Sequence, residues 1–513
     1  MKIWRELRLA VFPVLAAVYP ALSLAAGNAA AGVPDRLVRT VLAAAAAGAA
    51  LWALSALLTR DPDRRMLVAL AGVVWFSGYG AWERAARGTL LAPRALALSA
   101  SLLLLAAAVA WVARTRRGLA TPARIARATA VLVLAFPLFT LAMQPRPAVA
   151  KPAQPGRTMV HPVADSLPSI YLIILDKYTG TRSLAANHGY DNTPFEARLR
   201  EMGFTVGRGA ATNYPHTWLS LPSMLNWEPV DSILAGRPQR EWMTALRTAL
   251  DDNRTARFLR ERGYEYVFVP SGFPFTSTSS LADRVVGAPR RHGMDLWAAW
   301  AAETPLRMLP ARHAGSRGRP PPFPSESGRE MEKKLQTIAA LADGRRPRFV
   351  FAHLLLPHEP FIFRADCTHR EPYWPTSEYG EEGQAVRAAY LEQVSCTSRL
   401  VERMVADILR RSAVPPVILL QADHGHGFVT LETATGSQLP RARLRPGQAE
   451  ERMDAFAAYY LPGGGAAGLY EGMTAVNLMP VVLNHYLDAG IPLREDRVYW
   501  ATLHPPFNLE RIR

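Results

Sequence analysis

Residues 169–176 have the sequence Ser-Ile-Tyr-Leu-Ile-Ile-Leu-Asp, an apolar run that ends at a carboxylate. A short run of this kind, apolar on both faces, is typical of a strand buried inside a parallel sheet. We therefore expect a strand over Ser169–Leu175. Four similar runs follow it: Tyr264–Val269, Arg348–Leu354, Val417–Gln421 and Phe456–Leu461. Helical patterns alternate with these runs, which predicts an α/β domain with a mainly parallel central sheet.

Segments with helical periodicity separate the predicted strands. They are Pro194–Met202, Leu219–Leu225, Thr255–Arg262, Glu330–Leu341, Gln384–Arg410 and Asn477–Asp488. Ala311–Gly328, rich in Pro, Gly and Ser, and Thr435–Arg452, which carries three Arg residues, predict long surface excursions.

The first 150 residues have a different composition, dominated by Ala, Leu and Val. They contain five apolar stretches: Leu9–Ala26, Leu37–Leu58, Met66–Trp82, Leu96–Val112 and Thr129–Met143. A helix needs about 20 apolar residues to span a bilayer. The third stretch is the weakest, because Ser77, Gly78 and Gly80 interrupt it. A cleavable signal peptide is an alternative for the first stretch, but the repetition favours retained spans.

We therefore predict an N-terminal α-helical membrane bundle of about five spans in residues 1–145. A Pro-rich linker follows at 146–166, and an extracytoplasmic catalytic domain at 167–513. Basic residues set the orientation, because they favour the cytoplasmic side. They gather before the first span, between spans two and three (Arg60, Arg64, Arg65), and between spans four and five. This pattern places the N-terminus inside and the catalytic domain outside, on the periplasmic side of a bacterial inner membrane.

The charge and the cysteine content narrow the partners and the compartment. The formal net charge of +16 suits anionic lipid headgroups or glycans. Nucleic acid is not expected as a partner, because the Arg residues are scattered and no aromatic-basic motif occurs. The two cysteines, Cys367 and Cys396, are enough for one disulfide in an oxidising compartment. Two separate thiols are the alternative.

Potential ligands follow several of the predicted strands directly. Asp176 follows the first, His353 and His358 lie at the end of the third, and Asp423 and His424 follow the fourth. Open α/β sheets bind their ligands at the carboxyl ends of strands, so these side chains predict a site there. Taken alone, Asp176 is equally well explained as a helix cap, and His353 as a hydrogen-bonded core histidine.

Residues 213–225, Asn-Tyr-Pro-His-Thr-Trp-Leu-Ser-Leu-Pro-Ser-Met-Leu, place Thr217 where a loop turns into a helix. A helix N-terminus and a metal ion both favour loss of the hydroxyl proton, which makes a threonine nucleophilic. A simple N-cap is the alternative for Thr217. The segment 422–427, Ala-Asp-His-Gly-His-Gly, adds a carboxylate, two imidazoles and glycines that let the backbone approach a bound ion. A polar turn is the plainer interpretation of that segment.

Together these motifs resemble the alkaline phosphatase/sulfatase superfamily. The resemblance rests on the order Asp176, Thr217-x-x-Ser220-x-Pro222, His353 to His358, and Asp423-His424-Gly425. Within the superfamily, the chain is most similar to the membrane-anchored phosphoethanolamine transferases and lipoteichoic acid synthases, which also have a five-span anchor. The resemblance implies an alkaline-phosphatase-like fold for most of residues 169–490.

The resemblance also implies roles for single residues. Asp176, Thr217, Asp423 and His424 would hold one divalent ion, zinc or manganese, and Thr217 would be the nucleophile. The substrate phosphate would contact His358, His353 and, with a spacing that differs from that of the transferases, His426. The transferases have Glu in place of Asp176. A formylglycine sulfatase requires a C/S-x-P-x-R motif, which this sequence lacks.

Three functions follow from this resemblance. The first is a transferase that moves a phospho-alcohol group, of the phosphoethanolamine or glycerophosphate type, from a membrane phospholipid to an envelope glycan or lipid through phospho-Thr217. The second is a phosphodiesterase or phosphatase, in which water resolves the same intermediate. The third is a non-catalytic membrane scaffold with a degenerate site. The intact set of predicted ligands favours the first two over the third.

Overall fold

The computed structural model describes residues 2–27, 37–86, 90, 94–115, 118–143, 167–207, 211–286, 296–308, 326–344, 346–373, 380–427, 441, 444, 447–502 and 507–513. The chain forms two compact units. The first contains residues 1–149, 291–314 and 319–324, and the second contains the remaining residues. The predicted linker at 146–166 lies outside the described residues, so its boundaries stay a prediction.

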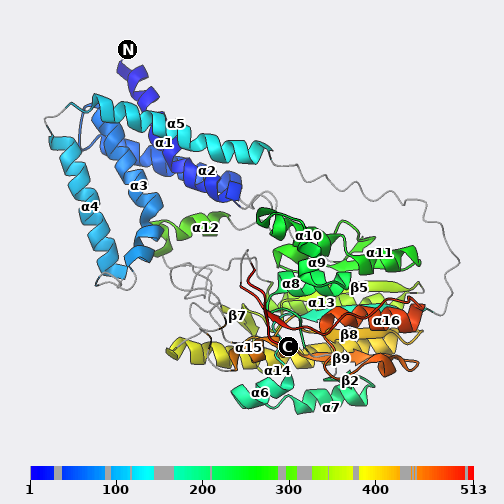
Figure 1. Ribbon diagram of the computed structural model, residues 1–513. Helices are drawn as coiled ribbons and strands as arrows, with labels where there is room; N and C mark the ends of the chain where they lie inside the picture. The colour runs from blue at the N-terminus through cyan, green and yellow to red at the C-terminus, as the bar shows by residue number, and fades with distance from the viewer. Residues whose placement is uncertain are drawn as a thin grey trace. The chain divides into compact units, whose positions relative to one another are not determined.

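Five long helices make up most of the first unit (Figure 1): α1 (Lys2–Gly27), α2 (Leu37–Ser55), α3 (Pro62–Ala86), α4 (Arg94–Arg114) and α5 (Ala120–Met143). Each is long and apolar enough to cross a membrane. This confirms the prediction of five apolar helices, including the interrupted third stretch. Close packing of α1 and α2 depends on Gly48, because a Cβ there would lie 2.8 Å from the carbonyl oxygen of Pro13.

Basic side chains join several helix ends at one end of this bundle. Arg64, near the start of α3, donates to the carbonyl oxygens of Val112 and Thr115 at and just after the end of α4. Arg65 forms an ion pair with Glu6 of α1, and its guanidinium lies over the Trp52 ring of α2. The starts of α1 and α3 therefore share an end with the ends of α2 and α4. This arrangement is the one that successive spans of alternating direction require.

The second unit is built on a seven-stranded sheet with the order β2-β9-β8-β1-β5-β3-β4. The strands are β1 (Ile170–Leu175), β2 (Thr205–Val206), β3 (Glu265–Val269), β4 (Arg284–Val285), β5 (Arg348–Leu354), β8 (Val417–Gln421) and β9 (Ala457–Tyr460). The pairs formed by β1, β3, β4, β5 and β8 are parallel, whereas β9 runs antiparallel to β8 and to β2. The predicted α/β domain with a mainly parallel sheet is therefore confirmed.

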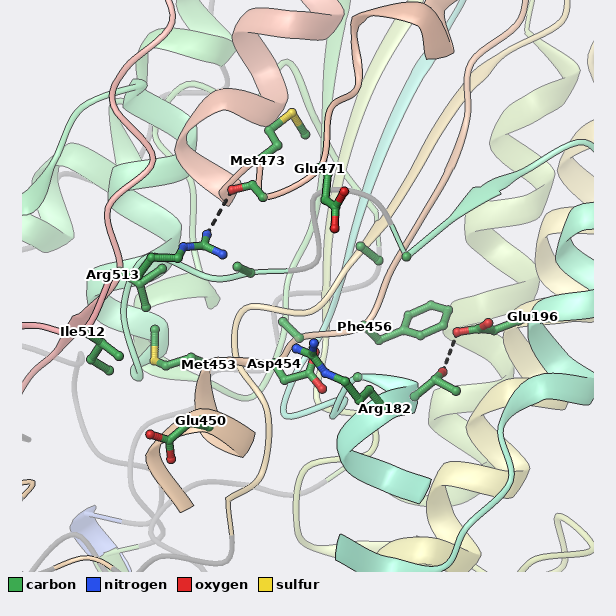
Figure 2. Close-up of a pocket in the computed structure, with 18 residues that line it drawn as sticks. Arg182, Glu196, Glu450, Met453, Asp454, Phe456, Glu471, Met473, Ile512 and Arg513 are labelled. Carbon is green, nitrogen blue, oxygen red and sulfur yellow. Dashed lines mark hydrogen bonds and ion pairs between the residues drawn. The ribbon is translucent and has the colours of Figure 1, made fainter. Parts of the chain in front are cut away.

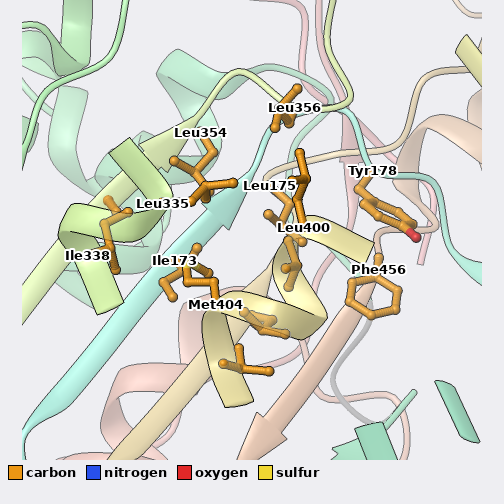
Figure 3. Packing of buried hydrophobic residues seen from close by; sticks show 14 of the residues in the cluster. Ile173, Leu175, Tyr178, Leu335, Ile338, Leu354, Leu356, Leu400, Met404 and Phe456 are labelled. Atoms are coloured by element: carbon orange, nitrogen blue, oxygen red, sulfur yellow. The ribbon is translucent and has the colours of Figure 1, made fainter. Parts of the chain in front are cut away.

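Helices cover both faces of the sheet, and β1 contributes alternate side chains to each face. Tyr171, Ile173 and Leu175 pack with α6 (Thr181–His188), α7 (Thr193–Glu201), α13 (Gly328–Ala340) and α14 (Gly380–Arg411) (Figure 3). Ile170, Leu172 and Ile174 pack with α8 (Thr217–Asn226), α10 (Trp242–Asp251), α11 (Arg254–Glu261) and α16 (Leu478–Leu487). Burial on both faces explains why this strand shows no alternation of polar residues.

All six predicted helices of this unit are present, as α7, α8, α11, α13, α14 and α16. Its short elements were not predicted: α6, α9 (Val230–Leu234), α10, the edge strands β2 and β4, the pair β6 (Phe361–Phe363) and β7 (His369–Tyr373), and the pair β10 (Tyr499–Trp500) and β11 (Glu510–Arg511). The short helix α12 (Leu296–Ala302) of the first unit was not predicted either. The excursion predicted over Thr435–Arg452 is wrong at its end, where Gln448–Met453 forms α15. The Arg residues of this stretch suggested an exposed loop, but Glu451 and Arg452 at its end are buried.

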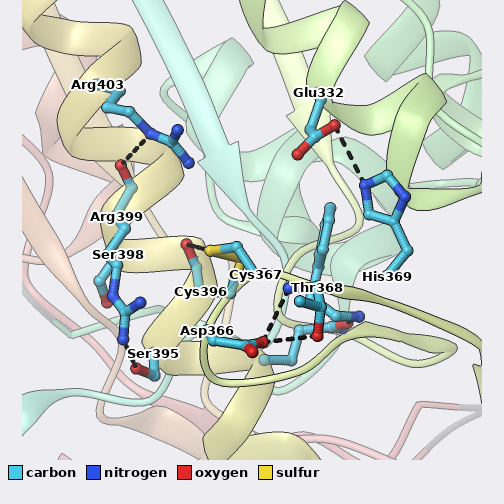
Figure 4. The surroundings of a disulfide bond; sticks show 12 residues. Glu332, Asp366, Cys367, Thr368, His369, Ser395, Cys396, Ser398, Arg399 and Arg403 are labelled. Atoms are coloured by element: carbon cyan, nitrogen blue, oxygen red, sulfur yellow. Dashed lines mark hydrogen bonds and ion pairs between the residues drawn. A yellow bond between two sulfur atoms is a disulfide. The ribbon is translucent and has the colours of Figure 1, made fainter.

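The predicted disulfide between Cys367 and Cys396 is confirmed (Figure 4). Cys367 lies between β6 and β7, and Cys396 lies inside α14. Their Cα atoms are 5.0 Å apart, within the range that disulfides require. The bond fastens the β6–β7 hairpin to a helix of the core.

The orientation of the spans gives a first prediction. A phosphatase reporter fused after Gln154 should be active, because that point follows the fifth span and would lie outside. The same reporter fused after Arg117 should be inactive. Reporter activity in intact cells, normalised to the amount of fusion protein, measures the difference. The reverse pattern would refute the orientation.

The disulfide gives a second prediction. Replacing both cysteines with serine should lower the free energy of unfolding by about 3 kcal/mol, because the bond closes a loop with a sequence separation of 29 residues. Thermal unfolding of the purified protein, with and without reductant, measures the loss, and the serine variant should not respond to reductant. Alkylation of both thiols in unreduced native protein would show that the bond is absent in the cell envelope.

Candidate active site

The register of the sheet brings the two predicted carboxylates together. Ile174 of β1 pairs with Gln421 of β8, so Asp176 and Asp423 occupy equivalent positions two residues beyond this pair. Neighbouring strands lie about 4.8 Å apart, so the two carboxyl groups meet just beyond the carboxyl edge of the sheet. Ligand atoms of Asp176, Asp423 and His424 all lie within 4.8 Å of one another, and the three residues are buried.

Thr217 is the first residue of α8, and His216 before it occupies the N-cap position in extended conformation. The Thr217 hydroxyl donates to Asp423 Oδ2 over 2.6 Å and lies 3.4 Å from His424 Nε2. The N-cap interpretation of Thr217 is therefore wrong, because its hydroxyl bonds to a site carboxylate and the N-cap position belongs to His216. Its place at the positive helix end favours negative charge on the oxygen.

The donor atoms fit a divalent cation. Asp176 Oδ1 is buried without a hydrogen-bond partner, so a cation would satisfy it. His424 Nδ1 lies 2.9 Å from the carbonyl oxygen of Gly425, which directs Nε2 toward Thr217 and Asp423. Two carboxylates, one imidazole nitrogen and one hydroxyl form a donor set that zinc or manganese accepts.

The electrostatics of the site also favour a cation. Burial, followed by the neighbouring Asp176, raises the pKa of Asp423 to about 7. For Asp176, burial acts to raise the pKa, but His358, His353 and Lys177 outweigh it and the pKa is lowered. Burial, reinforced by Arg452, holds the pKa of His424 well below its usual value, so the ring is neutral and able to ligate. A cation between the two carboxylates would offset their repulsion.

His353 lies behind the carboxylate of Asp176. Its Nε2 is 3.2 Å from Asp176 Oδ2, and its Nδ1 is 2.7 Å from the Thr276 hydroxyl. The ring is fully buried. The Thr276 contact favours the hydrogen-bonded core histidine over a substrate contact, and the ring lies beside the Asp176 carboxylate.

His358 and His426 face a second group beside the carboxylates, formed around Glu359. Glu359 Oε2 lies 3.6 Å from His358 Nδ1 and 3.9 Å from His426 Nε2. Lys177 Nζ lies 2.8 Å from Glu359 Oε1, and both side chains are buried. The seven residues predicted from the sequence therefore gather at one edge of the sheet, in two adjoining groups that Lys177 connects.

The profile of the sulfatase family matches residues 168–482, more than half of the chain. The chain belongs to the sulfatase family. This confirms the predicted membership of the alkaline phosphatase/sulfatase superfamily. No curated protein matches the chain in sequence.

The chain is also similar to several solved structures, at low sequence identity and low TM-score. The periplasmic domain of EcEptC from Escherichia coli in complex with Zn is 13% identical, covering 60% of this chain and 76% of that chain, with a TM-score of 0.38. The periplasmic domain of the phosphoethanolamine transferase EptC from Campylobacter jejuni is 11% identical. The match covers 62% of this chain and 89% of that chain, with a TM-score of 0.37. The phosphonate monoester hydrolase of Agrobacterium radiobacter is 15% identical. The match covers 65% of this chain and 80% of that chain, with a TM-score of 0.39. Likeness at this level does not identify a substrate.

Four residues that support the candidate site were not recognised from the sequence. Lys177 has a φ of 61°, a conformation unusual for a residue with a side chain, and its N–H donates to Asp423 Oδ1. Glu359 anchors Lys177. Buried Arg452 donates to the carbonyl oxygens of Pro215 and His426, which ties the Thr217 loop to the histidine loop. Lys177 and Glu359 directly follow the predicted site residues Asp176 and His358, and this position could have indicated their role. No comparable feature of the sequence pointed to Arg452.

Gln393 of α14 is the fourth of these residues. Its amide nitrogen donates to the carbonyl oxygens of Pro357 and His358, and its oxygen accepts from the N–H of Ile362. The N–H of His358 donates in turn to the carbonyl oxygen of Asp176. The His358 loop is thus fixed both to Asp176, one of the predicted metal ligands, and to α14, the helix that carries Cys396.

Gly425 has a different function from the one expected. A Cβ at this position would lie 2.1 Å from the carbonyl oxygen of Glu451 and 2.9 Å from that of Asp454. The glycine therefore lets the α15 segment approach the Asp423-His424 turn.

A cavity of about 590 Å³ lies elsewhere in this unit (Figure 2). It is lined by residues that include Arg182, Glu196, Asp454, Glu471 and Arg513. None of the seven predicted site residues lines it, so it is separate from the candidate active site.

The ligand set gives a third prediction. Asp423→Ala and His424→Ala should each abolish binding of the one ion, because they remove a carboxylate and the one imidazole, which bind a divalent cation more strongly than a neutral hydroxyl does. Elemental analysis of purified protein measures the ion. Tyr470→Phe, which alters a hydroxyl bonded to Asp496 away from the site, should leave the metal content unchanged. Two ions per wild-type chain would contradict the single-site arrangement.

Proposed function

We propose that this protein is a membrane-anchored transferase. It moves a phospho-alcohol group from a membrane phospholipid to a glycan or lipid of the cell envelope through a phospho-Thr217 intermediate. The observation that carries the proposal is the contact of the Thr217 hydroxyl with Asp423 at a helix N-terminus, inside a sulfatase-family fold. The catalytic domain would act on the periplasmic side of a bacterial inner membrane.

Asp176, Thr217, Asp423 and His424 would hold one zinc or manganese ion. When bound, such an ion supplies a Lewis acid for the phosphoryl oxygen and lowers the pKa of a bound hydroxyl. The Thr217 hydroxyl donates to Asp423 Oδ2 over 2.6 Å, so this carboxylate would take the proton that Thr217 loses when its oxygen attacks. The N-terminus of α8 stabilises negative charge on that oxygen.

Thr217 Oγ1 would attack the phosphorus of the donor, and the bond between phosphorus and the diacylglycerol oxygen would break. Diacylglycerol would leave with the proton that Thr217 gave up, and the phospho-alcohol group would remain on Thr217. An acceptor hydroxyl would then attack the same phosphorus and restore the threonine. Lys177, His358 and His426 border the ligand group, where they would contact the non-bridging phosphoryl oxygens.

A hydrolase is the second candidate, and the same contact favours it, because water in place of the acceptor would resolve the same intermediate. Radiolabelled phospholipid distinguishes the two activities. Diacylglycerol with a modified acceptor supports transfer, and diacylglycerol with only free phospho-alcohol supports hydrolysis. A non-catalytic scaffold would yield neither product. The clustering of the predicted ligands and nucleophile argues against that third function.

The nucleophile gives a fourth prediction. Thr217→Ala should lose turnover by at least a factor of about 10³, because no other hydroxyl replaces the nucleophile, while three metal donors remain. Thr217→Ser should keep part of the activity, since only a methyl group is removed. Incubation with donor alone, followed by peptide mass spectrometry, should find the added mass on the peptide containing residue 217. Wild-type turnover by Thr217→Ala would refute the covalent route and the transferase with it.

A further inference from the structure

Part of the sequence between two elements of the catalytic unit belongs to the membrane unit. The chain leaves the sheet at β4 and returns to it through α13, and between them α12 (Leu296–Ala302) and the short 3₁₀ helix η4 (Pro305–Met308) lie in the first unit. The chain therefore enters the membrane unit twice, once through residues 1–149 and once through this insertion.

The insertion packs tightly against three of the spanning helices. Trp300 is only 2% exposed and forms a buried cluster with Ala21 of α1 and Ala44 of α2. Its ring centroid lies 5.9 Å from that of Phe76 of α3. The small side chains of the two alanines leave room for the indole, in the way that small residues permit close packing between spanning helices.

Polar contacts fix the segment that follows α12. The N–H of Gly80 in α3 donates to the carbonyl oxygen of Glu303 over 3.0 Å. The Tyr79 hydroxyl lies 3.5 Å from the sulfur of Met308. The insertion is thus held by side-chain packing at α12 and by hydrogen bonds just after it.

All these contacts lie at one end of the bundle. Ala21 is in the second half of α1, Ala44 in the first half of α2, and Phe76 and Gly80 in the second half of α3. The opposite end carries Arg64 and its contacts to the end of α4. Since basic residues favour the cytoplasmic side, the insertion occupies the extracytoplasmic end.

The composition of α12 suits that depth. Its sequence, Leu-Trp-Ala-Ala-Trp-Ala-Ala, contains no charge. Trp297 is 37% exposed, and Met308 is 40% exposed. Tryptophan is enriched where the hydrocarbon meets the headgroups, so a half-exposed Trp297 beside a buried Trp300 fits a helix at the outer interface of the bilayer.

We propose that residues 296–308 form a second membrane attachment, docked among the outer ends of α1, α2 and α3. It holds the catalytic half of the chain on the membrane independently of the connection through α5. The partner is the outer headgroup region of the bilayer together with these three helices. The proposal does not depend on the reaction catalysed.

Cleavage of the linker tests the attachment in the full-length protein. A specific protease site inserted after Gln154 is cut in isolated membranes, which are then washed at high salt to remove purely electrostatic binding of this basic chain. The fragment that begins after the cut should remain in the membrane pellet. Its release into the supernatant would overturn the proposal.

A second variant identifies the segment responsible. Replacing residues 296–308 with a Gly-Ser stretch of equal length should leave the uncut protein in the membrane but release the fragment after cleavage. Retention of the fragment in this variant would also overturn the proposal, because another contact would then hold it. Binding of the metal by the released fragment, measured by elemental analysis, shows that the catalytic unit is still folded.

A matched pair of substitutions tests the Trp300 contact. Ala44→Leu fills the space that the indole occupies and should increase the released fraction after cleavage. Ala46→Leu lies on the exposed side of the same helix and should leave that fraction at the wild-type value. Equal release by the two variants would show that the packing of Trp300 does not hold the fragment.

Discussion

The candidate site depends on two buried carboxylates that the sheet holds side by side. The register of β1 with β8 fixes Asp176 next to Asp423, and neither side chain is open to water. Two like charges in this position repel each other, which contributes to the raised pKa of Asp423. The arrangement is stable only where cations and hydrogen-bond donors surround it, and the rest of the site supplies them.

These supports come from segments that lie far apart in the sequence. The N–H groups of Lys177 and His424 and the hydroxyl of Thr217 all donate to Asp423. Arg452 joins the two loops that carry the nucleophile and His426, and Gln393 fixes the loop of His358. Because these groups also fix the backbone, the ligands are held in place before any ion binds, which is the preorganisation that electrostatic catalysis requires.

Much of this could be predicted from the sequence, because strands buried on both faces and polar residues directly after them are local signals. β1 and Asp176 are examples, and Thr217 was recognisable at a predicted helix start. Contacts that depend on tertiary packing gave no such signal. Arg452 and Glu451 had the composition of an exposed loop, yet both are buried. The short helix α12 had an apolar pattern too brief to distinguish it from a core segment.

The exposure of the site residues bears on the choice between transfer and hydrolysis. Six of the seven predicted site residues are buried: Asp176, Thr217, Asp423, His424, His353 and His426. Among the seven, only the His358 side chain, at 24% exposed, has substantial access to solvent. In the reaction proposed above, a substrate would reach Thr217 from the side of His358, the most exposed of these residues. Water would use the same approach, so the fold alone does not favour an acceptor over water. The choice between acceptor and water would then depend on whether an acceptor fills the space beside His358. A bound acceptor would exclude water from the line of attack on a phospho-threonine. If the proposed intermediate forms, the side chains around Glu359 would therefore decide between the two reactions, because Asp176, Asp423 and His424 would serve both equally.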